Sequence, residues 1–171
     1  MEDKDWQIKV QDSNLMFFRT SIVNQGVNSR SDDLILASFR KFVRKVGSNL
    51  NFLDLGSGSG YVVCYAAYLG LKSHGIEINS DFHQMAQEEV KKAIQTNLIK
   101  EVKLIEGDFF KLNFDFSQVD IFYHYQTHPE EKILDFFSKK AKKGAYLFFV
   151  KIGLNKPVES LPGVKLIQGS E

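Results

Sequence analysis

A glycine-rich loop behind an acidic residue is the first feature of this sequence whose residue types and spacing suggest chemistry. In "LDLGSGSG", Gly56, Gly58 and Gly60 follow Asp54 at alternate positions. Glycine loses more backbone entropy on folding than other residues, so such a run indicates a segment that turns tightly or lets a ligand approach the main chain. We therefore predict a ligand-binding loop here.

The spacing of the loop argues against two kinds of phosphate site. A dinucleotide-binding loop has the pattern G-x-G-x-x-G, and Tyr61 occupies the position of its third glycine. A Walker loop needs a lysine directly after its last glycine, and Tyr61 stands there too. The carboxylate of Asp54 would repel a pyrophosphate, but it can accept a hydrogen bond from an amine or a hydroxyl.

Two more acidic residues follow later apolar runs. Glu77 lies in "GIEINS" and Asp108 in "IEGDFF". The two oxygens of a carboxylate match a vicinal diol, so we predict that Glu77 binds both hydroxyls of a ribose. Asp108 is expected to accept a hydrogen bond from an adenine amine, with Phe109 stacking on the base. Together the loop and the two acids predict a nucleoside ligand.

The elements that must position these residues alternate along the chain. Strands are expected at 51–56, 73–78, 102–108, 119–125 and 145–152, with further candidates at 5–10 and 164–169, and helices at 31–46, 61–69, 80–97 and 127–143. Such alternation predicts an α/β fold with a doubly wound, mostly parallel sheet and helices on both faces. Ligands bind beyond the carboxyl ends of such strands, where Asp54, Glu77, Asp108 and Tyr125 would lie.

Three of the helices carry specific expectations. Ser31 is the predicted N-cap of the first, and Thr127 with Glu130 has capping-box spacing at the start of the last. Gly47 is expected to end the first helix. The predicted inward residues are Ile35, Phe39, Phe42, Val43 and Val46 in helix 31–46, and Phe82, Met85, Ala86, Val90, Ala93 and Ile94 in helix 80–97.

Composition predicts an ordinary globular domain. The chain has 171 residues, 43% of them hydrophobic, and a net charge of +1, so no strong field favours nucleic acid or a membrane surface. One cysteine, Cys64, and the absence of a signal peptide or a long apolar run favour a cytoplasmic protein without a membrane span. The histidines show no metal-ligand spacing, so no metal is expected. We predict a single domain over 1–171, with an N-terminal arm at 1–30 and an α/β core at 31–171.

The glycine loop, Glu77 and Asp108, in this order, resemble the signature of class I S-adenosylmethionine-dependent methyltransferases. The resemblance implies a Rossmann-like fold, here curtailed at the C-terminus, and S-adenosylmethionine as cofactor. It implies that the loop passes under the amino-acid end of the cofactor, that Glu77 binds its ribose and that Asp108 contacts its adenine. The predicted cofactor-binding residues are Asp54, Gly56, Ser57, Gly58, Gly60, Glu77, Ile78, Asp108 and Phe109.

The segment "IFYHYQTHPEEKILDFF" bears on the methyl acceptor. It lacks the N-P-P-Y-type motif of enzymes that methylate adenine or cytosine amines, and it resembles compact protein-lysine methyltransferases, namely archaeal broad-specificity enzymes and mitochondrial relatives that act on membrane-carrier or ATP-synthase lysines. In this interpretation Tyr123 or Tyr125 lines an amine channel through a cation–π contact, and His124 takes a proton from the lysine. The chain departs from that group at "GVNSRS", where an aromatic–proline–Ser/Thr element is usual. The alternatives are a small-molecule or RNA methyltransferase and a non-catalytic S-adenosylmethionine-binding subunit.

Overall fold

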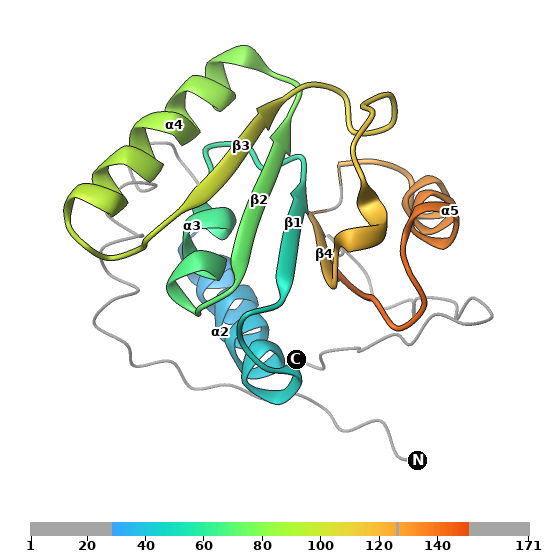
Figure 1. The fold of residues 1–171 in the computed structure, drawn as a ribbon, viewed down its shortest axis with the longest axis horizontal. Helices are drawn as coiled ribbons and strands as arrows, with labels where there is room; N and C mark the ends of the chain where they lie inside the picture. Colours follow the sequence, from blue (N-terminus) through green and yellow to red (C-terminus); the bar gives the residue numbers. More distant parts are fainter. Residues whose placement is uncertain (1–28, 126, 151–171) are drawn as a thin grey trace.

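The computed structural model describes residues 29–125 and 127–150, and in this part of the chain strands and helices alternate (Figure 1). The elements are α2 (Ser29–Val46), β1 (Asn51–Leu55), α3 (Tyr61–Tyr68), β2 (Lys72–Glu77), α4 (Ser80–Gln95), β3 (Val102–Glu106), the 3-10 helix η1 (Phe116–Gln118), β4 (Ile121–Tyr125), α5 (Glu130–Lys140) and β5 (Tyr146–Val150). The candidate strands at 5–10 and 164–169 lie outside the described residues.

The five strands form one parallel sheet in the order β3-β2-β1-β4-β5. The chain therefore builds outward from β1 in one direction and then, from β4, in the other. Such a reversal of strand order places a crevice between the carboxyl ends of the two central strands. The predicted doubly wound α/β fold is confirmed.

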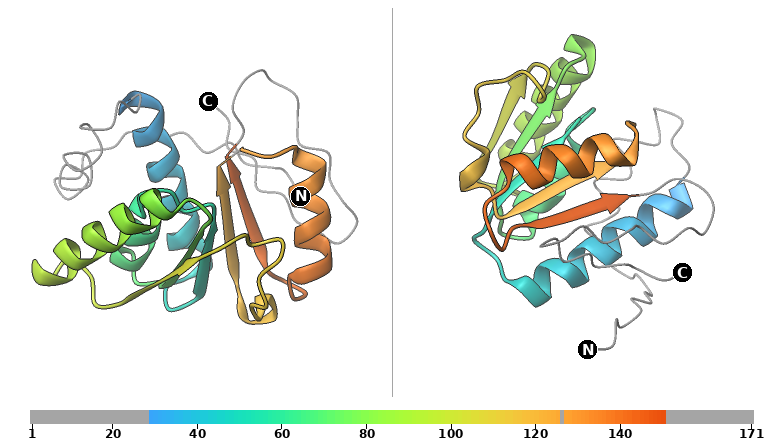
Figure 2. Two further views of the ribbon diagram at one scale, coloured as in Figure 1. Left: turned by 90° about the horizontal axis from the view of Figure 1, so that it is seen from above. Right: turned by 90° about the vertical axis from the view of Figure 1, so that its right-hand side faces the viewer.

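Two apolar layers cover the two faces of the sheet. On one face α2, α3 and α4 pack against β-strand residues such as Phe52 and Ile121. On the other face α5 packs against the alternate residues Leu53 and Phe122. Figure 2 shows α5 on the opposite side of the sheet from α2 and α3. The connection between β3 and β4 contains only η1, so within residues 29–125 and 127–150 no second long helix stands beside α5 on that face.

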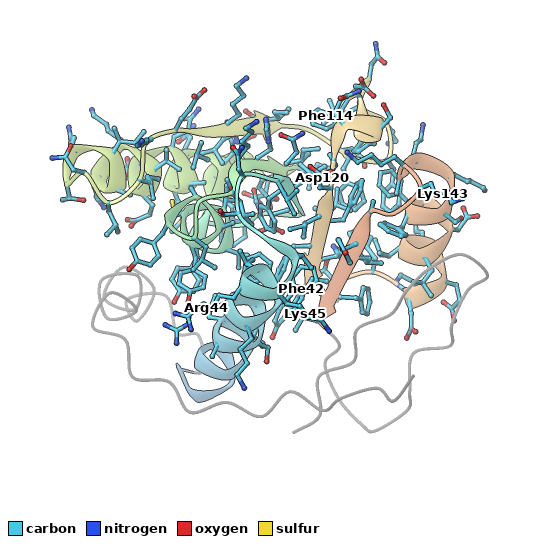
Figure 3. All side chains as sticks on the ribbon, turned by 60° about the horizontal axis from the view of Figure 1, so that its bottom comes forward. Phe42, Arg44, Lys45, Phe114, Asp120 and Lys143 are labelled. Atoms are coloured by element: carbon cyan, nitrogen blue, oxygen red, sulfur yellow. The ribbon has the colours of Figure 1, made fainter. Side chains whose placement is uncertain are left out.

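The first helix presents its predicted apolar face to the sheet. Phe39, Phe42 and Val43 are buried, and Ile35 and Val46 are partly buried against the same cluster. Figure 3 shows Phe42 on the sheet side of α2 and Arg44 pointing away from it. Gly47 ends the helix as predicted, with its N–H donating to the Val43 carbonyl at 2.8 Å.

Several local predictions are wrong. Helix α2 begins at Ser29, so Ser31 lies inside it and is not its N-cap. Helix α5 begins at Glu130 with Pro129 at the N-cap, and the Thr127 hydroxyl instead lies 3.1 Å from Nδ1 of the neighbouring His128.

The inward face of α4 is narrower than predicted. Phe82 and Ile94 are 46% and 40% exposed, whereas His83 is buried in line with Ala86, Val90 and Ala93. These buried residues are three or four apart, which is the spacing of a single helical stripe, and Phe82 and Ile94 flank that stripe.

Candidate active site

The carboxyl ends of β1, β2, β3 and β4 meet at one edge of the sheet, and the predicted site residues lie there. Asp54 of β1 pairs with Gly75 of β2 on one side and with Tyr123 of β4 on the other. Glu77 is the last residue of β2 and Tyr125 the last of β4. The arrowheads of these strands gather at the same edge in Figure 1.

The glycine loop turns the chain from β1 into α3 and leaves open space outside it. Gly56 has φ +85° and Gly58 has φ +52°, a region that side chains rarely adopt. A Cβ atom added at either glycine would meet nothing within 4 Å. At Gly60 an added Cβ would lie 2.9 Å from Cβ of Ala86, so this glycine lets the loop pack against α4. Gly56 and Gly58 therefore leave room for a ligand, and Gly60 fits the loop to the fold.

Glu77 is buried and faces this loop. Its Oε2 accepts a hydrogen bond from the N–H of Gly58 at 2.7 Å, and its Oε1 accepts one from the N–H of Asn79 at 2.8 Å. These two bonds fix the orientation of the carboxylate. Each oxygen keeps further acceptor capacity for a hydroxyl donor. The geometry therefore fits the predicted contact with a ribose diol.

Asp54 lies below the loop, deep in the sheet. Burial raises the pKa of its carboxyl group well above the ordinary value of 3.8, and the negative charge of Glu77 raises it further. Asp54 therefore retains its proton to higher pH than an exposed aspartate.

Asp108 follows β3 at the same edge and remains accessible. Its Oδ1 accepts a hydrogen bond from the N–H of Phe110 at 3.0 Å, and Oδ2 lies 3.3 Å from Nζ of Lys111. The bond from Phe110 lowers the pKa of Asp108, and the hydrogen bond and charge of Lys111 add to it, so the group is an ionised acceptor at neutral pH.

The ring of Phe109 is buried in the core, although a residue that stacks on a base was expected to be accessible. It packs edge-on against Phe136 and His128 on the α5 side. Ile78, directly after Glu77, is an apolar side chain that this edge does expose, with 65% of it accessible. This packing does not favour the stacking predicted for Phe109, which stays a prediction, whereas Ile78 is open to a ligand.

Only one of the three predicted catalytic residues is accessible. Tyr125 is 37% exposed. Tyr123 is buried and stacks on Phe148 at 5.7 Å between ring centroids. His124 points to the other face of the sheet, is 0% exposed, and bonds through Nδ1 to the carbonyl of Leu55 at 2.6 Å. The burial of both rings does not favour the roles predicted for Tyr123 and His124 at the acceptor, which stay predictions.

Two further residues, Gly75 and Asn79, shape the site and were not among the site residues predicted from the sequence. An added Cβ at Gly75 would lie 2.8 Å from Oγ of Ser57, so this glycine makes room for the loop beside β2. An isolated glycine inside a strand pattern is a signal of such close approach. Asn79 caps α4 by accepting from the N–H groups of Asp81 and Phe82, while its own N–H holds Glu77. The sequence "NSD" before a helix carries this signal.

The described residues contain no cluster of three or more side chains arranged to hold a metal ion. Within the same ranges no helix is long and apolar enough to cross a membrane.

A doubly wound parallel sheet with a glycine loop after β1 and an acid at the end of β2 defines the class of Rossmann-like nucleoside-cofactor proteins. The family model described as a methyltransferase domain matches residues 53–149. The chain therefore belongs to that methyltransferase family. Among curated proteins, none matches the sequence.

The chain is also similar to solved structures of methyltransferases. The chain is 25% identical to an RNA methyltransferase from Salinibacter ruber in complex with S-adenosyl-L-homocysteine, with a TM-score of 0.55, covering 72% of this chain and 82% of that one. A putative caffeoyl-CoA O-methyltransferase from Staphylococcus aureus is 19% identical, with a TM-score of 0.63 and coverages of 81% and 66%. The magnesium protoporphyrin IX methyltransferase of Synechocystis PCC 6803 with bound SAH is 17% identical, with a TM-score of 0.56 and coverages of 75% and 65%. The last two show the shared fold.

The protein is an S-adenosylmethionine-dependent methyltransferase. The residues fit this cofactor, because the space outside Gly56 and Gly58 is open and Glu77 presents an oriented carboxylate beside it. When bound, the cofactor supplies a methyl group already activated on a sulfonium. The protein mainly has to align donor and acceptor, and rate then comes chiefly from proximity.

Proposed function

We propose that this methyltransferase transfers its methyl group to the side-chain amine of a protein lysine. The supporting observation is Tyr125, an exposed aromatic ring at the carboxyl end of β4, where the neighbouring Tyr123 and His124 are both buried. An aromatic face attracts an ammonium group and can guide it to the donor. Removal of the amine from water beside such a wall also favours its neutral, nucleophilic form.

The molecule already contains such a contact after β3. Nζ of Lys132, in the first turn of α5, lies 4.0 Å from the centroid of the Phe110 ring. An aromatic ring on this side of the sheet, that of Phe110, thus already holds a lysine ammonium group. The connection between β3 and β4 contains only η1 and no α-helix, which also supports access by a bulky substrate.

In this proposal each group has its own task. The glycine loop, with Ser57, and Glu77 bind and orient the cofactor together with Ile78 and Asp108. Asp54 supports the loop from beneath. Tyr125 receives the lysine. These assignments are inferred from position, burial and hydrogen bonding.

The acceptor class can be tested with isotope-labelled S-adenosylmethionine and a cell lysate. Labelled protein bands whose label maps to lysine would support the proposal, and label only in RNA or in small molecules would contradict it. Within the protein, Tyr125→Phe should retain labelling, because its ring remains, and Tyr125→Ala should reduce it while leaving S-adenosylhomocysteine binding unchanged. Cofactor binding without any labelling would instead favour a non-catalytic binding subunit.

RNA is the second candidate acceptor. It is supported by the 25% identity to the RNA methyltransferase of Salinibacter ruber, of which this chain covers 82%. The labelling experiment separates this candidate, because RNA extracted from the lysate would carry the label and nuclease treatment would remove it. A single methyltransferase domain over 1–171 and a cytoplasmic location complete the proposal and stay predictions.

A further inference from the structure

We propose that His124 is a positioning residue for the cofactor loop. Its imidazole holds the Leu55 carbonyl and thereby the start of the glycine loop in the conformation that binds S-adenosylmethionine. This role of His124 concerns cofactor binding only and is therefore independent of the methyl acceptor.

The contact between the two residues fixes the chemistry of the ring. Nδ1 of His124 lies 2.6 Å from the carbonyl oxygen of Leu55. A carbonyl only accepts, so Nδ1 carries the hydrogen. Burial lowers the pKa of His124; the bond to Leu55 raises it in part, and the charge of the nearby His128 lowers it again, so the pKa lies below its ordinary value and the neutral ring with a bare Nε2 is the form present at neutral pH.

The bond lies where the backbone pairing of the two central strands stops. Strands β1 and β4 pair from Phe52 with Ile121 to Asp54 with Tyr123. Leu55 and His124 come one step later, and there the imidazole provides the link between the strands.

On the other side of the loop, β2 provides its own attachment. The carbonyl of Ile76 accepts from the N–H groups of Gly56 at 2.9 Å and Ser57 at 3.0 Å. The start of the loop is therefore held from both neighbouring strands, by main-chain bonds from β2 and by a side chain from β4.

Filling space in the core does not by itself explain why a histidine occupies this position. The ring is 0% exposed and lies among the rings of Phe109, Phe149 and His128, with centroids 6.0, 5.8 and 5.4 Å away. Its Nε2 is buried and has no partner among the described residues. A buried acceptor without a partner is unfavourable, and a phenylalanine would fill the space without it. The Nδ1 donor is the property that an apolar ring lacks.

The test uses three substitutions at His124 and one matched control. The amide nitrogen of asparagine is bonded to Cγ, as Nδ1 is, so His124→Asn can still donate to Leu55. His124→Gln places its donor one bond further out, and His124→Phe has none. His74→Phe is the control, because His74 also lies near a backbone carbonyl, that of Lys72 at 3.3 Å, but near the opposite ends of the strands.

We expect the Phe and Gln variants to bind S-adenosylhomocysteine about tenfold more weakly than the wild type by calorimetry, and the Asn variant and His74→Phe to bind as the wild type does. Circular dichroism would establish that each variant is folded. Wild-type affinity in folded His124→Phe, or equal losses in the Asn and Gln variants, would overturn the proposal. If the variants do not fold, nitrogen NMR of the wild type decides: a hydrogen on Nδ1 of His124 is required, and one on Nε2 contradicts the proposal.

Discussion

The backbone N–H of Gly58 donates a 2.7 Å hydrogen bond to Oε2 of Glu77, and this bond joins the glycine loop to the end of β2. The residue that we expect to bind the ribose thus also holds the loop beside it. Cofactor binding and loop geometry depend on the same carboxylate, so substitutions of Glu77 should act on both.

Glu77→Ala should weaken S-adenosylhomocysteine binding more than about 100-fold, because it removes two charge-assisted contacts to a ribose. Glu77→Gln should fall between this variant and the wild type, since its single carbonyl oxygen retains part of the acceptor capacity. Calorimetry measures both. Glu106→Gln is the matched control, because Glu106 stands beside Glu77 in the neighbouring strand but accepts from the Ser80 hydroxyl and not from the glycine loop, so affinity should not change. Unchanged affinity in Glu77→Ala would refute the ribose assignment.

Gly56→Ala and Gly60→Ala should separate ligand binding from stability. At Gly60 the new methyl group would lie 2.9 Å from Cβ of Ala86, so strain and overpacking should lower the free energy of unfolding by about 2–4 kcal/mol. At Gly56 the added Cβ meets nothing, so the backbone strain alone should cost about 1–2 kcal/mol. Gly56→Ala should, however, reduce S-adenosylhomocysteine affinity by filling the open space. Urea unfolding and calorimetry test the pair, and equal stabilities would show that the contact with Ala86 relaxes freely.

Ser57→Ala tests the predicted contact between this hydroxyl and the cofactor. Oγ of Ser57 is buried and has no partner among the described residues, so its removal should leave the stability of the unliganded protein unchanged or raise it by about 1 kcal/mol. If the hydroxyl binds the cofactor, affinity for S-adenosylhomocysteine should fall at the same time. A variant with unchanged affinity would remove Ser57 from the site.

Asp54→Asn should stabilise the protein increasingly as pH rises. The pKa of Asp54 is 3.8 in the unfolded chain and is raised well above this in the folded protein. At pH values between the unfolded-state pKa and the folded-state pKa, the folded protein therefore binds more protons than the unfolded chain. Wild-type stability therefore falls with rising pH in that window, by up to about 1.4 kcal/mol per pH unit for this group. The variant lacks this loss. Urea unfolding at several pH values between 4 and 8 measures the difference, and a constant difference would contradict the raised pKa.

Asp120→Asn is the control of opposite sign. Burial alone would raise the pKa of Asp120, but hydrogen bonds from Lys142 and from the N–H of Asn51, with the charge of Lys142, outweigh it and lower the pKa. This carboxylate should contribute stability at neutral pH that is lost as pH falls through its lowered pKa. The variant should therefore be less stable than the wild type at pH 7, and the two should converge in acid.

The order of elements and the edge that carries the site could be predicted from the sequence, and the depth of individual side chains could not. Strand alternation in β4 places Tyr123 and His124 on opposite faces of the sheet. Both faces of a parallel sheet are covered, however, so alternation does not distinguish a buried residue from an exposed one. Only Tyr125, at the last position of the strand, is exposed.

Packing between residues distant in the sequence accounts for the other features that the sequence did not predict. The burial of Phe109 depends on α5, whose position is set by contacts distant in the sequence. The bond between His124 and Leu55 joins residues 69 positions apart and carries no local signal. In α4, Phe82 and Ile94 fit an apolar helix face by their type, but the sheet contacts only the narrower stripe through Ala86 and Val90.

Cys64, the single cysteine of the chain, lies buried in α3 directly after the glycine loop, and burial raises the pKa of its thiol to about 12. A thiol of this kind reacts with alkylating reagents only when the helix separates from the sheet. The rate at which Cys64 is alkylated therefore reports how often the structure opens locally beside the cofactor loop. Because the protein has one thiol, mass spectrometry can follow this alkylation without any introduced label. The decrease in the alkylation rate on addition of S-adenosylhomocysteine measures how far the ligand suppresses this local opening.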